Sequence, residues 1–393
     1  MNGDAAQGRT LKVLVDATAI PVDRGGVGRY VDEILLALMG RSDVEIAVVC
    51  QARDLRRMSA ALPDAEVLAA PAVAARRVAR LVWEQTGLPL LARRLGADVV
   101  HSPHYTAPLA GMSASVVTVH DATFFSDPGV HSGVKGRFFR AATRLAVRRA
   151  DALVAPSRAT RDEVIRYAGG AAERFHVAHH GVDASVFHPV DRAESERVAA
   201  SLGLAGTPYV AFLGTLEPRK NVPALVRGWQ AAVSSMPNPP ALVLAGGPGW
   251  DTHVQPAVDA VPASLRVVRA GYLPFEDLAG FLAGAEVVAY PSLGEGFGLP
   301  VLEAMACGAA VLTSRRLSLP EVGGDAVEYT ETDAEAIGRA LGRLLHDSAR
   351  RAELAAAGLE RSRLFTWASA ADVHVDAYRA AARRRAGRSR GGR

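Results

Sequence analysis

Long hydrophobic runs and an N-terminal leader pattern are both absent from this 393-residue sequence. No stretch of about 18 residues is apolar and free of charge, so a membrane-spanning helix is not expected. The first residues, MNGDAAQGRTLKVLVDAT, lack a positively charged segment followed by an apolar one. A signal peptide is therefore not expected either, and the chain is predicted to be cytoplasmic.

Cysteine is also scarce. Cys50 and Cys307 are the only two, and each lies in an apolar segment. This pattern indicates buried thiols in a reducing compartment and excludes a disulfide framework.

What is abundant is typical of a globular protein. Apolar residues make up 49% and charged residues 22% of the chain, which is enough to bury two sizeable cores. The length suggests two domains. The net charge of +4 is small, but residues 379–393, RAAARRRAGRSRGGR, form a dense basic cluster. This cluster is either a solvated terminus or a contact with an anionic membrane or polyanion, which would place the protein peripherally at the inner face of the membrane.

Short apolar runs alternate with amphipathic helical patterns along almost the whole chain. The runs are LKVLVDAT, VEIAVVC, DVVHSP, SVVTVHD and DALVAPS in the first half, then YVAFLGT, PALVLAGG, LRVVRAGY, EVVAYPS and AAVLTS. Such alternation is typical of βαβ units around parallel sheets, so we expect two successive α/β domains. Ligands of such folds lie beyond the carboxyl ends of the strands, and two facing domains leave a cleft between those ends.

The domain boundaries follow from the polar segment 183–198, which interrupts the alternation and is the best candidate for a linker. The predicted domains are residues 1–190 and 191–365. A helix over residues 366–385 is expected to return to the first domain, and residues 386–393 are expected to form a basic tail.

The first loop of interest, PVDRGGVGRY, carries Gly25, Gly26 and Gly28 just before an amphipathic helix. Glycines let backbone amides approach a ligand, and a helix N-terminus favours an anion such as a phosphate. A tight turn explains the glycines equally well. The loop lacks the full G-x-G-x-x-G spacing, and no acidic residue ends the second strand, which argues against a dinucleotide site.

The matching loop of the second domain, LGTLEPRKN, places Arg219 and Lys220 side by side before a helix. Adjacent cations at a helix start are unfavourable for the helix dipole, so we expect an anion to neutralise them. The forked guanidinium of Arg219 and the compact ammonium of Lys220 together suit two linked phosphates. The alternative is a basic pair that is simply solvated.

Two further strand ends carry candidate residues. His120 and Asp121 end the run VTVHD and are expected to face the cleft, His120 as a polar contact to substrate or as a structural residue. Asp121 either orients His120 or caps the next turn. Tyr272 and Leu273 end another run and either form an apolar wall for a nucleobase or pack in the core.

The most distinctive segment is GEGFGLPVLEAMACG, residues 294–308. A glycine-rich loop is expected to carry Glu295, and Glu303 is expected in the first turn of a helix that begins near Pro300. The glycines Gly294, Gly296 and Gly298 would let a ligand approach the backbone closely. Three interpretations remain open: charges that complement the helix dipole, an acid/base pair, or two carboxylates that accept hydrogen bonds from sugar hydroxyls.

These residues resemble a known family. EGFGLPVLE is similar to the E-x7-E motif of the retaining glycosyltransferases of family 4, which have the GT-B fold: two Rossmann-like domains that face each other across a cleft, with a C-terminal helix crossing back to the first domain. The resemblance extends over GGVGRY, the HD at His120, HGVDASVFHP, GTLEPRKN and FTW. GTLEPRKN looks most like the branch of mannosyl- and related transferases that act on polysaccharides or glycolipids.

The resemblance implies roles for individual residues. Glu295 would contact the hexose of a nucleotide sugar and Glu303 the ribose. Lys220 would bind the diphosphate, and His120 would lie beside the transferred sugar. The further donor-binding residues that the resemblance implies are Gly26, Val27, Gly28, Thr215, Arg219, Tyr272, Leu273, Gly296, Phe297, Gly298 and Leu299. Thr215 occupies a position where many members of the family have an arginine, and Arg219 would supply that charge.

The resemblance further implies a retaining hexosyl transfer from a nucleotide sugar, best matched by GDP-mannose, to a glycan, glycolipid or small-molecule hydroxyl. Other UDP- or dTDP-sugar donors are alternatives. No cofactor, metal or nucleic acid is expected, in keeping with the absence of a D-x-D triplet. The competing hypotheses are a nicotinamide-dependent oxidoreductase and a nucleotide-sugar-binding scaffold without turnover.

Overall fold

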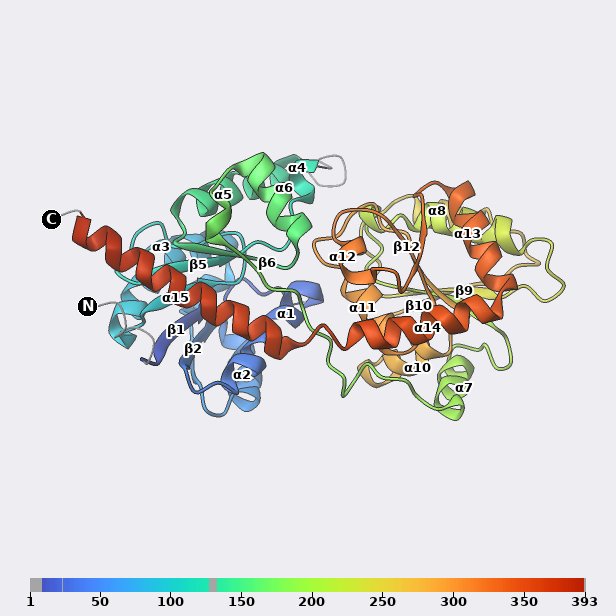
Figure 1. Ribbon diagram of the computed structural model, residues 1–393, viewed down its shortest axis with the longest axis horizontal. Coiled ribbons are helices and arrows are strands. Elements are labelled where there is room, and N and C mark those ends of the chain that lie inside the picture. Colours follow the sequence, from blue (N-terminus) through green and yellow to red (C-terminus); the bar gives the residue numbers. More distant parts are fainter. Residues whose placement is uncertain (1–8, 23, 127–132, 392–393) are drawn as a thin grey trace. The chain divides into compact units, whose positions relative to one another are not determined.

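The computed structural model describes residues 9–22, 24–126 and 133–391. The chain forms two compact units, Met1–Gly181 together with Trp367–Arg393, and Val182–Thr366 (Figure 1). The boundaries between the units therefore lie at 181/182 and 366/367, compared with the predicted 190/191 and 365/366. Both units are layered α/β structures, as the alternating pattern predicted.

The first unit is built on a seven-stranded sheet in the order β3-β2-β1-β4-β5-β6-β7, in which every described pairing is parallel. The strands are β1 (Leu11–Asp16), β2 (Val44–Cys50), β3 (Glu66–Ala69), β4 (Val99–Ser102), β5 (Ala114–Thr118), β6 (Ala152–Ala155) and β7 (Phe175–Val177). The helices are α1 (Gly25–Met39), η1 (Ala52–Asp54), α2 (Leu55–Ala61), η2 (Ala72–Ala75), α3 (Arg77–Leu95), α4 (Thr123–Ser126), α5 (Gly133–Arg149), α6 (Arg158–Ala168), η4 (Ala172–Arg174) and α15 (Trp367–Gly391).

The second unit is built on a six-stranded parallel sheet in the order β10-β9-β8-β11-β12-β13. Its strands are β8 (Tyr209–Leu213), β9 (Ala241–Ala245), β10 (Val267–Gly271), β11 (Val287–Tyr290), β12 (Val311–Ser314) and β13 (Glu328–Thr330). Its helices are α7 (Arg192–Ser201), η5 (Pro218–Lys220), α8 (Val222–Val233), α9 (Val254–Asp259), η6 (Phe275–Asp277), α10 (Leu278–Ala283), α11 (Leu299–Ala306), α12 (Leu319–Gly323), α13 (Ala334–His346) and α14 (Ser348–Ser362).

Two predictions about the chain's organisation are wrong. The segment 183–198 is not simply a linker, because α7 begins within it: Asp191 caps this helix by accepting a hydrogen bond from the Glu194 amide, and Val198 joins the core of the second unit. Residues 386–391 are not a separate tail either, and residues 392–393 of the predicted tail lie outside the described residues. The helix α15 continues to Gly391, and two of its arginines contact the first unit, Arg385 at the Gly111 carbonyl and Arg388 at Asp151, 3.0 Å away.

None of the helices within the described ranges is long and apolar enough to span a bilayer.

The helix α15 belongs to the first unit although it follows the whole second unit in sequence, and Figure 1 shows it lying across the first sheet. Its apolar side chains Ala371, Val375 and Tyr378 are at most 1% exposed and lie in the same core as the residues of β1 and α1. Burial of this apolar face supplies most of the free energy that holds the helix against the first unit.

A chain of buried hydrogen bonds adds directional contacts to this packing. His374 Nδ1 donates to the carbonyl of Ala370 at 2.7 Å, because a carbonyl can only accept. Its Nε2 therefore accepts from Tyr30 Oη, also at 2.7 Å. Tyr30 has then used its proton and accepts from Thr118 Oγ1 at 2.9 Å.

The chain continues from β5 to β4 and back to α15. Thr118 accepts from His101 Nε2 at 2.9 Å, so His101 Nδ1 accepts from Tyr378 Oη, also at 2.9 Å. All the hydrogen bonds in this series thus run in one direction, from Tyr378 to the carbonyl of Ala370. Both imidazoles are neutral. Burial supports this state, because it lowers the pKa of His374 to about 4 and the pKa of His101 well below its ordinary value.

Two tyrosine variants test this series of hydrogen bonds. Tyr30→Phe removes a donor from His374 and an acceptor from Thr118, whereas Tyr378→Phe leaves only His101 without its donor. At about 1–3 kcal/mol for each buried group left unsatisfied, Tyr30→Phe should lower the free energy of unfolding about twice as much as Tyr378→Phe. Urea denaturation of both variants measures the difference. Equal losses would contradict the assignment of two buried hydrogen bonds to Tyr30 and one to Tyr378.

Candidate active site

The loop after β8 brings the predicted cations into the second unit's interior. Pro218 opens the short helix η5, and Asn221 closes it in the left-handed conformation with φ 59°. The Asn221 amide holds this conformation by donating to the carbonyls of Pro291 at 3.2 Å and Thr332 at 2.7 Å. Arg219 and Lys220, the last two residues of η5, are thereby fixed beside the loop that follows β11.

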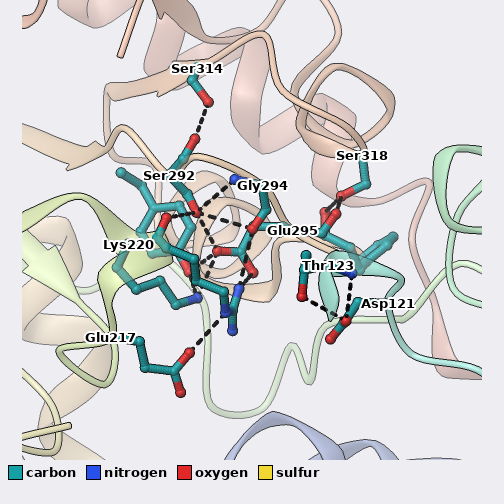
Figure 2. Close-up of polar contacts among 12 residues, drawn as sticks. Asp121, Thr123, Glu217, Lys220, Ser292, Gly294, Glu295, Ser314 and Ser318 are labelled. Atoms are coloured by element: carbon teal, nitrogen blue, oxygen red, sulfur yellow. Dashed lines mark hydrogen bonds and ion pairs between the residues drawn. The ribbon is translucent and has the colours of Figure 1, made fainter. Parts of the chain in front are cut away.

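Glu295 lies at the centre of this loop cluster (Figure 2). Its Oε1 accepts from Lys220 Nζ at 2.8 Å, Ser292 Oγ at 2.7 Å and Tyr290 Oη at 3.0 Å. Its Oε2 accepts from Arg219 Nη1. Glu295 is 6% exposed, so this carboxylate is almost fully withdrawn from solvent and held by charged and neutral donors together.

A second carboxylate completes the charge balance. Glu217 accepts from Arg219 Nε at 2.8 Å, so two cations face two carboxylates within one cluster. The expectation of an anion beside Arg219 and Lys220 is met by the chain itself. The solvated-pair alternative is wrong, because Lys220 is only 6% exposed.

The electrostatics of the cluster keep Glu295 ionised. Burial alone would raise the pKa of this carboxyl, but Arg219 and Lys220 outweigh burial and lower the pKa to about 2. For Lys220, burial and the neighbouring Arg219 lower the pKa of the amine, while Glu295 opposes that shift. Arg219 has a side chain that is 23% exposed against 7% for Lys220, so it is the more accessible cation.

Two glycines of the loop after β11 have a packing role within the chain, and the predicted approach of a ligand to this loop stays a prediction. A Cβ on Gly294 would lie 2.8 Å from a methyl carbon of Leu317, and a Cβ on Gly298 would lie 2.8 Å from one of Leu319. Gly298 also has φ 108°, which favours glycine. These two glycines therefore make room for neighbouring leucines.

Ser318 anchors the same loop through its carbonyls. Its Oγ lies 2.8 Å from the carbonyl oxygens of both Glu295 and Phe297. Phe297 is 4% exposed and packs in the core, while Leu299 begins α11. The loop backbone that the resemblance assigns to the hexose is thus rigidly placed.

Glu303 lies one residue further into α11 than expected, because this helix begins at Leu299, and it therefore falls just after the first turn, which has no acidic residue. The residue is 1% exposed. The idea that it merely complements the helix dipole at the first turn is therefore wrong, and its ribose role stays a prediction.

The ends of β8, β9 and β10 form a closely packed backbone surface that was not predicted from the sequence. A Cβ on Gly246 would lie 2.3 Å from the Gly214 carbonyl oxygen, and one on Gly249 would lie 2.1 Å from that of Leu216. The half-buried Thr215 lies in the first of these loops. The signal that could have revealed this surface is the run GGPG at residues 246–249.

Tyr272 extends from the same edge. It is 62% exposed, and its ring lies against Gly247, where a Cβ would come within 2.5 Å of Tyr272 Oη. Core packing is therefore excluded for Tyr272. Leu273 is half-buried and does pack against the core of the second unit.

In the first unit, the glycine loop begins α1 directly. Gly26 is exposed with open space around it, and Val27 is half-buried. Gly28 is buried, and a Cβ there would lie 2.5 Å from Arg24 Cβ. Gly28 thus serves packing of the turn, and Gly26 is the position suited to backbone approach by a ligand.

His120 and Asp121 follow β5 but do not act on each other through a hydrogen bond. His120 Nε2 donates to the Pro103 carbonyl at 2.8 Å, and burial lowers the pKa of this imidazole. Asp121 accepts from the Thr123 amide at 3.1 Å and hydroxyl at 2.9 Å, so it caps the next turn. His120 is a neutral group whose Nδ1 carries the lone pair.

Comparison with known proteins places this architecture. A model described as "Glycosyltransferase Family 4" matches residues 24–186, and one described as "Glycosyl transferases group 1" matches residues 207–347. The O-antigen chain mannosyltransferase B of Escherichia coli is 32% identical over 72% of this chain and 74% of its own. The chain belongs to glycosyltransferase family 4.

Other relatives of this family 4 glycosyltransferase extend over nearly its full length. The alpha-maltose-1-phosphate synthase of Mycolicibacterium smegmatis is 31% identical over 90% of this chain and 95% of its own. Family membership removes the oxidoreductase alternative.

Solved structures agree on the GT-B fold. Anabaena HepE, determined with UDP and glucose, matches with a TM-score of 0.73 over 93% of this chain and 98% of its own at 19% identity. The lipopolysaccharide glycosyltransferase WaaG matches with a TM-score of 0.72 over 93% and 99% at 15% identity. At these identities the likeness concerns the fold alone.

The depressed pKa of Glu295 predicts how acid changes stability. In the unfolded chain Glu295 takes up a proton below its ordinary pKa of 4.5, whereas in the folded chain it stays ionised down to about pH 2. The stabilisation that Glu295 provides is therefore fully present above pH 4.5 and is lost as the pH falls from 4.5 to about 2. At pH 3.5 the loss is about 1.4 kcal/mol. The difference in unfolding free energy between wild type and Glu295→Gln should therefore shrink by about that amount from pH 7 to pH 3.5.

Denaturant unfolding at both pH values measures this shrinkage. The control is Glu335→Gln, whose side chain is 81% exposed and should show almost none of it. An unchanged difference for Glu295→Gln would show that the cluster does not hold the carboxylate ionised.

Proposed function

We propose that this family 4 glycosyltransferase transfers a hexose, with mannose from GDP-mannose as the preferred donor, to a hydroxyl of a glycan, glycolipid or small molecule with retention of anomeric configuration. The observation that carries the proposal is the Arg219–Lys220–Glu295 cluster at the carboxyl edge of the second sheet. The similarity to an O-antigen mannosyltransferase favours mannose.

Departure of a nucleoside diphosphate requires positive charge near the leaving oxygens. In the proposed complex the diphosphate contacts the more exposed Arg219 and draws on the field of Lys220, while Glu295 keeps both cations in position and faces the hexose. The transfer step uses these side chains and no metal. Glu303 accepts hydrogen bonds from the ribose.

The proposal includes the other predicted donor contacts. The exposed face of Tyr272 stacks against the base, with Leu273 and Thr215 at the same sheet edge. The backbone around Gly296, Gly298 and Leu299 lies along the hexose. On the first unit, Gly26 at the start of α1 approaches the phosphates, and neutral His120 contacts the transferred sugar.

Retention follows from attack on the same face as the leaving group. An acceptor hydroxyl attacks the anomeric carbon as the bond to the diphosphate oxygen breaks, and the hydroxyl proton passes to that departing oxygen. Exclusion of water protects the donor from hydrolysis.

The balance of cations and carboxylates determines how a donor would bind to the cluster. Each cation already has a carboxylate partner, so a diphosphate competes for Arg219 and does not fill an uncompensated positive pocket. Binding should consequently weaken as salt increases, because the exchange takes place at a partly exposed guanidinium.

A donor panel tests the assignment of base and sugar. GDP-mannose, UDP-glucose, dTDP-glucose and ADP-glucose are each incubated with the full chain, and release of nucleoside diphosphate is measured. GDP release from GDP-mannose should be fastest. Faster release from a UDP- or dTDP-sugar would replace the donor, and tight donor binding with no release or transfer would favour the scaffold hypothesis.

Lys220→Met tests charge stabilisation. Loss of the ammonium beside the leaving group should slow turnover by about 100-fold. The matched control is Lys12→Met, which removes a lysine of β1 paired with Glu45 at 2.9 Å and should leave turnover near normal. Near-normal turnover of Lys220→Met, with its melting temperature close to that of the wild type, would remove Lys220 from the site.

A further inference from the structure

Three polar side chains of the first unit meet where β1 and β4 end. Asp16 is the last residue of β1, His104 follows β4, and Glu84 projects from α3. One potential ligand atom from each lies within 4.8 Å of the others. Asp16 is 0% and Glu84 1% exposed, so both carboxylates are removed from solvent. Glu84 is balanced by Arg80 Nη1, which donates to its Oε2 at 2.9 Å, whereas among the described residues Asp16 faces His104 and no arginine or lysine, and an unbalanced buried charge is costly.

The hydrogen bonds around His104 determine which of its nitrogens carries a proton. Thr106 Oγ1 lies 2.7 Å from Glu84 Oε2 and must donate its only hydrogen to it, because a carboxylate accepts. His104 Nδ1 lies 3.1 Å from the same hydroxyl oxygen and therefore has to donate to it. In the neutral ring, Nε2 then carries the lone pair.

That lone pair faces another acceptor. His104 Nε2 lies 3.7 Å from Asp16 Oδ2, and neither atom makes a hydrogen bond to any described residue. The other oxygen of Asp16 is occupied by the amide and hydroxyl of Thr18, at 3.0 and 2.6 Å. This contact requires either a second ring proton on Nε2, which would make His104 an imidazolium, or a metal ion between the two acceptor atoms.

The separation of these two atoms suits a bound ion. It exceeds hydrogen-bond range but lies close to the spacing of about 3.4 Å between two ligands of a tetrahedral zinc ion with bonds of about 2.0–2.1 Å. A metal-binding histidine usually donates its other ring N–H to a partner that fixes its orientation. Thr106, itself bonded to Glu84, supplies that partner here.

Ser102 provides an independent sign of a bound species. Asp16 and Ser102 directly follow the paired residues Val15 and His101 on neighbouring parallel strands, so they lie side by side. Ser102 is 0% exposed, and its Oγ also lacks a hydrogen bond to any part of the chain that the structure describes. Each buried polar atom without a hydrogen-bond partner lowers the free energy of unfolding by about 1–3 kcal/mol. A group of such atoms close together therefore indicates a bound water or ion that they share.

We propose that Asp16 and His104, with Glu84 as the third group, bind one divalent cation of the zinc type in the first unit. The ion ties the loop after β4 to α3 and to the end of β1. It stabilises the first unit and takes no part in leaving-group departure. Its detection therefore does not depend on the proposed transfer activity.

The test uses the full chain without an affinity tag, dialysed against micromolar Zn²⁺ or Co²⁺. About one equivalent of metal per chain should remain, Co²⁺ should give visible absorption bands, and Zn²⁺ should raise the melting temperature by several degrees. The two cysteines do not compete readily, because both are buried and burial raises the pKa of the Cys50 thiol to about 11.

Three variants identify the ligands. His104→Gln and Asp16→Asn should each weaken metal binding at least 10-fold and abolish the metal-dependent rise in melting temperature. His253→Gln, at an exposed histidine of the second unit, should leave both unchanged. Melting curves without metal show that each variant is folded.

Two results would overturn the proposal. Retention of metal in folded His104→Gln at the wild-type level would place the ion elsewhere. Failure of the wild type to retain either ion would show that the Asp16–His104 contact is a carboxylate–imidazolium ion pair.

Discussion

One buried carboxylate organises the candidate site of the second unit. Glu295 joins η5 to the loop after β11 through Lys220 and Arg219, and Ser292 and Tyr290 complete its hydrogen bonds. Without this carboxylate, an ammonium that is 6% exposed would be left without its closest ionic partner, at a cost of several kcal/mol. The positions of both cations, and of the loop that carries them, consequently depend on a residue that is also predicted to face the substrate.

This arrangement suits Glu295 to two roles, ordering the two cations and accepting hydrogen bonds from substrate hydroxyls. Its low pKa keeps it an acceptor at any physiological pH, which suits a residue that orders cations and binds hydroxyls and does not suit a general acid. The paired spacing of Glu295 and Glu303 therefore does not describe an acid/base couple. One is tied to the cations, and the other lies in the second turn of the following helix.

Much of the fold was predictable because strands such as β8 and β9 are buried on both faces and so read as continuous apolar runs. The short edge strands β3, β7 and β13 were missed, since they have mixed burial and only three or four residues each. The motifs also located Glu295, Arg219 and Lys220. Their mutual pairing was not predictable, because it depends on how two loops separated by about seventy residues meet. The buried cluster of His101, His374 and Tyr378 was not predicted for the same reason, because its members come from distant segments.

The return of α15 to the first unit has a consequence for synthesis. A ribosome releases β1 to β7 long before Trp367, yet the core that contains Tyr30 and Ala371 needs the last helix to close. The second unit, which is contiguous in sequence, has all its parts as soon as Thr366 emerges. The half of the protein that is made first is therefore expected to mature last, and a nascent chain that stalls before its final helix would display an open apolar sheet face to the chaperones around the exit tunnel.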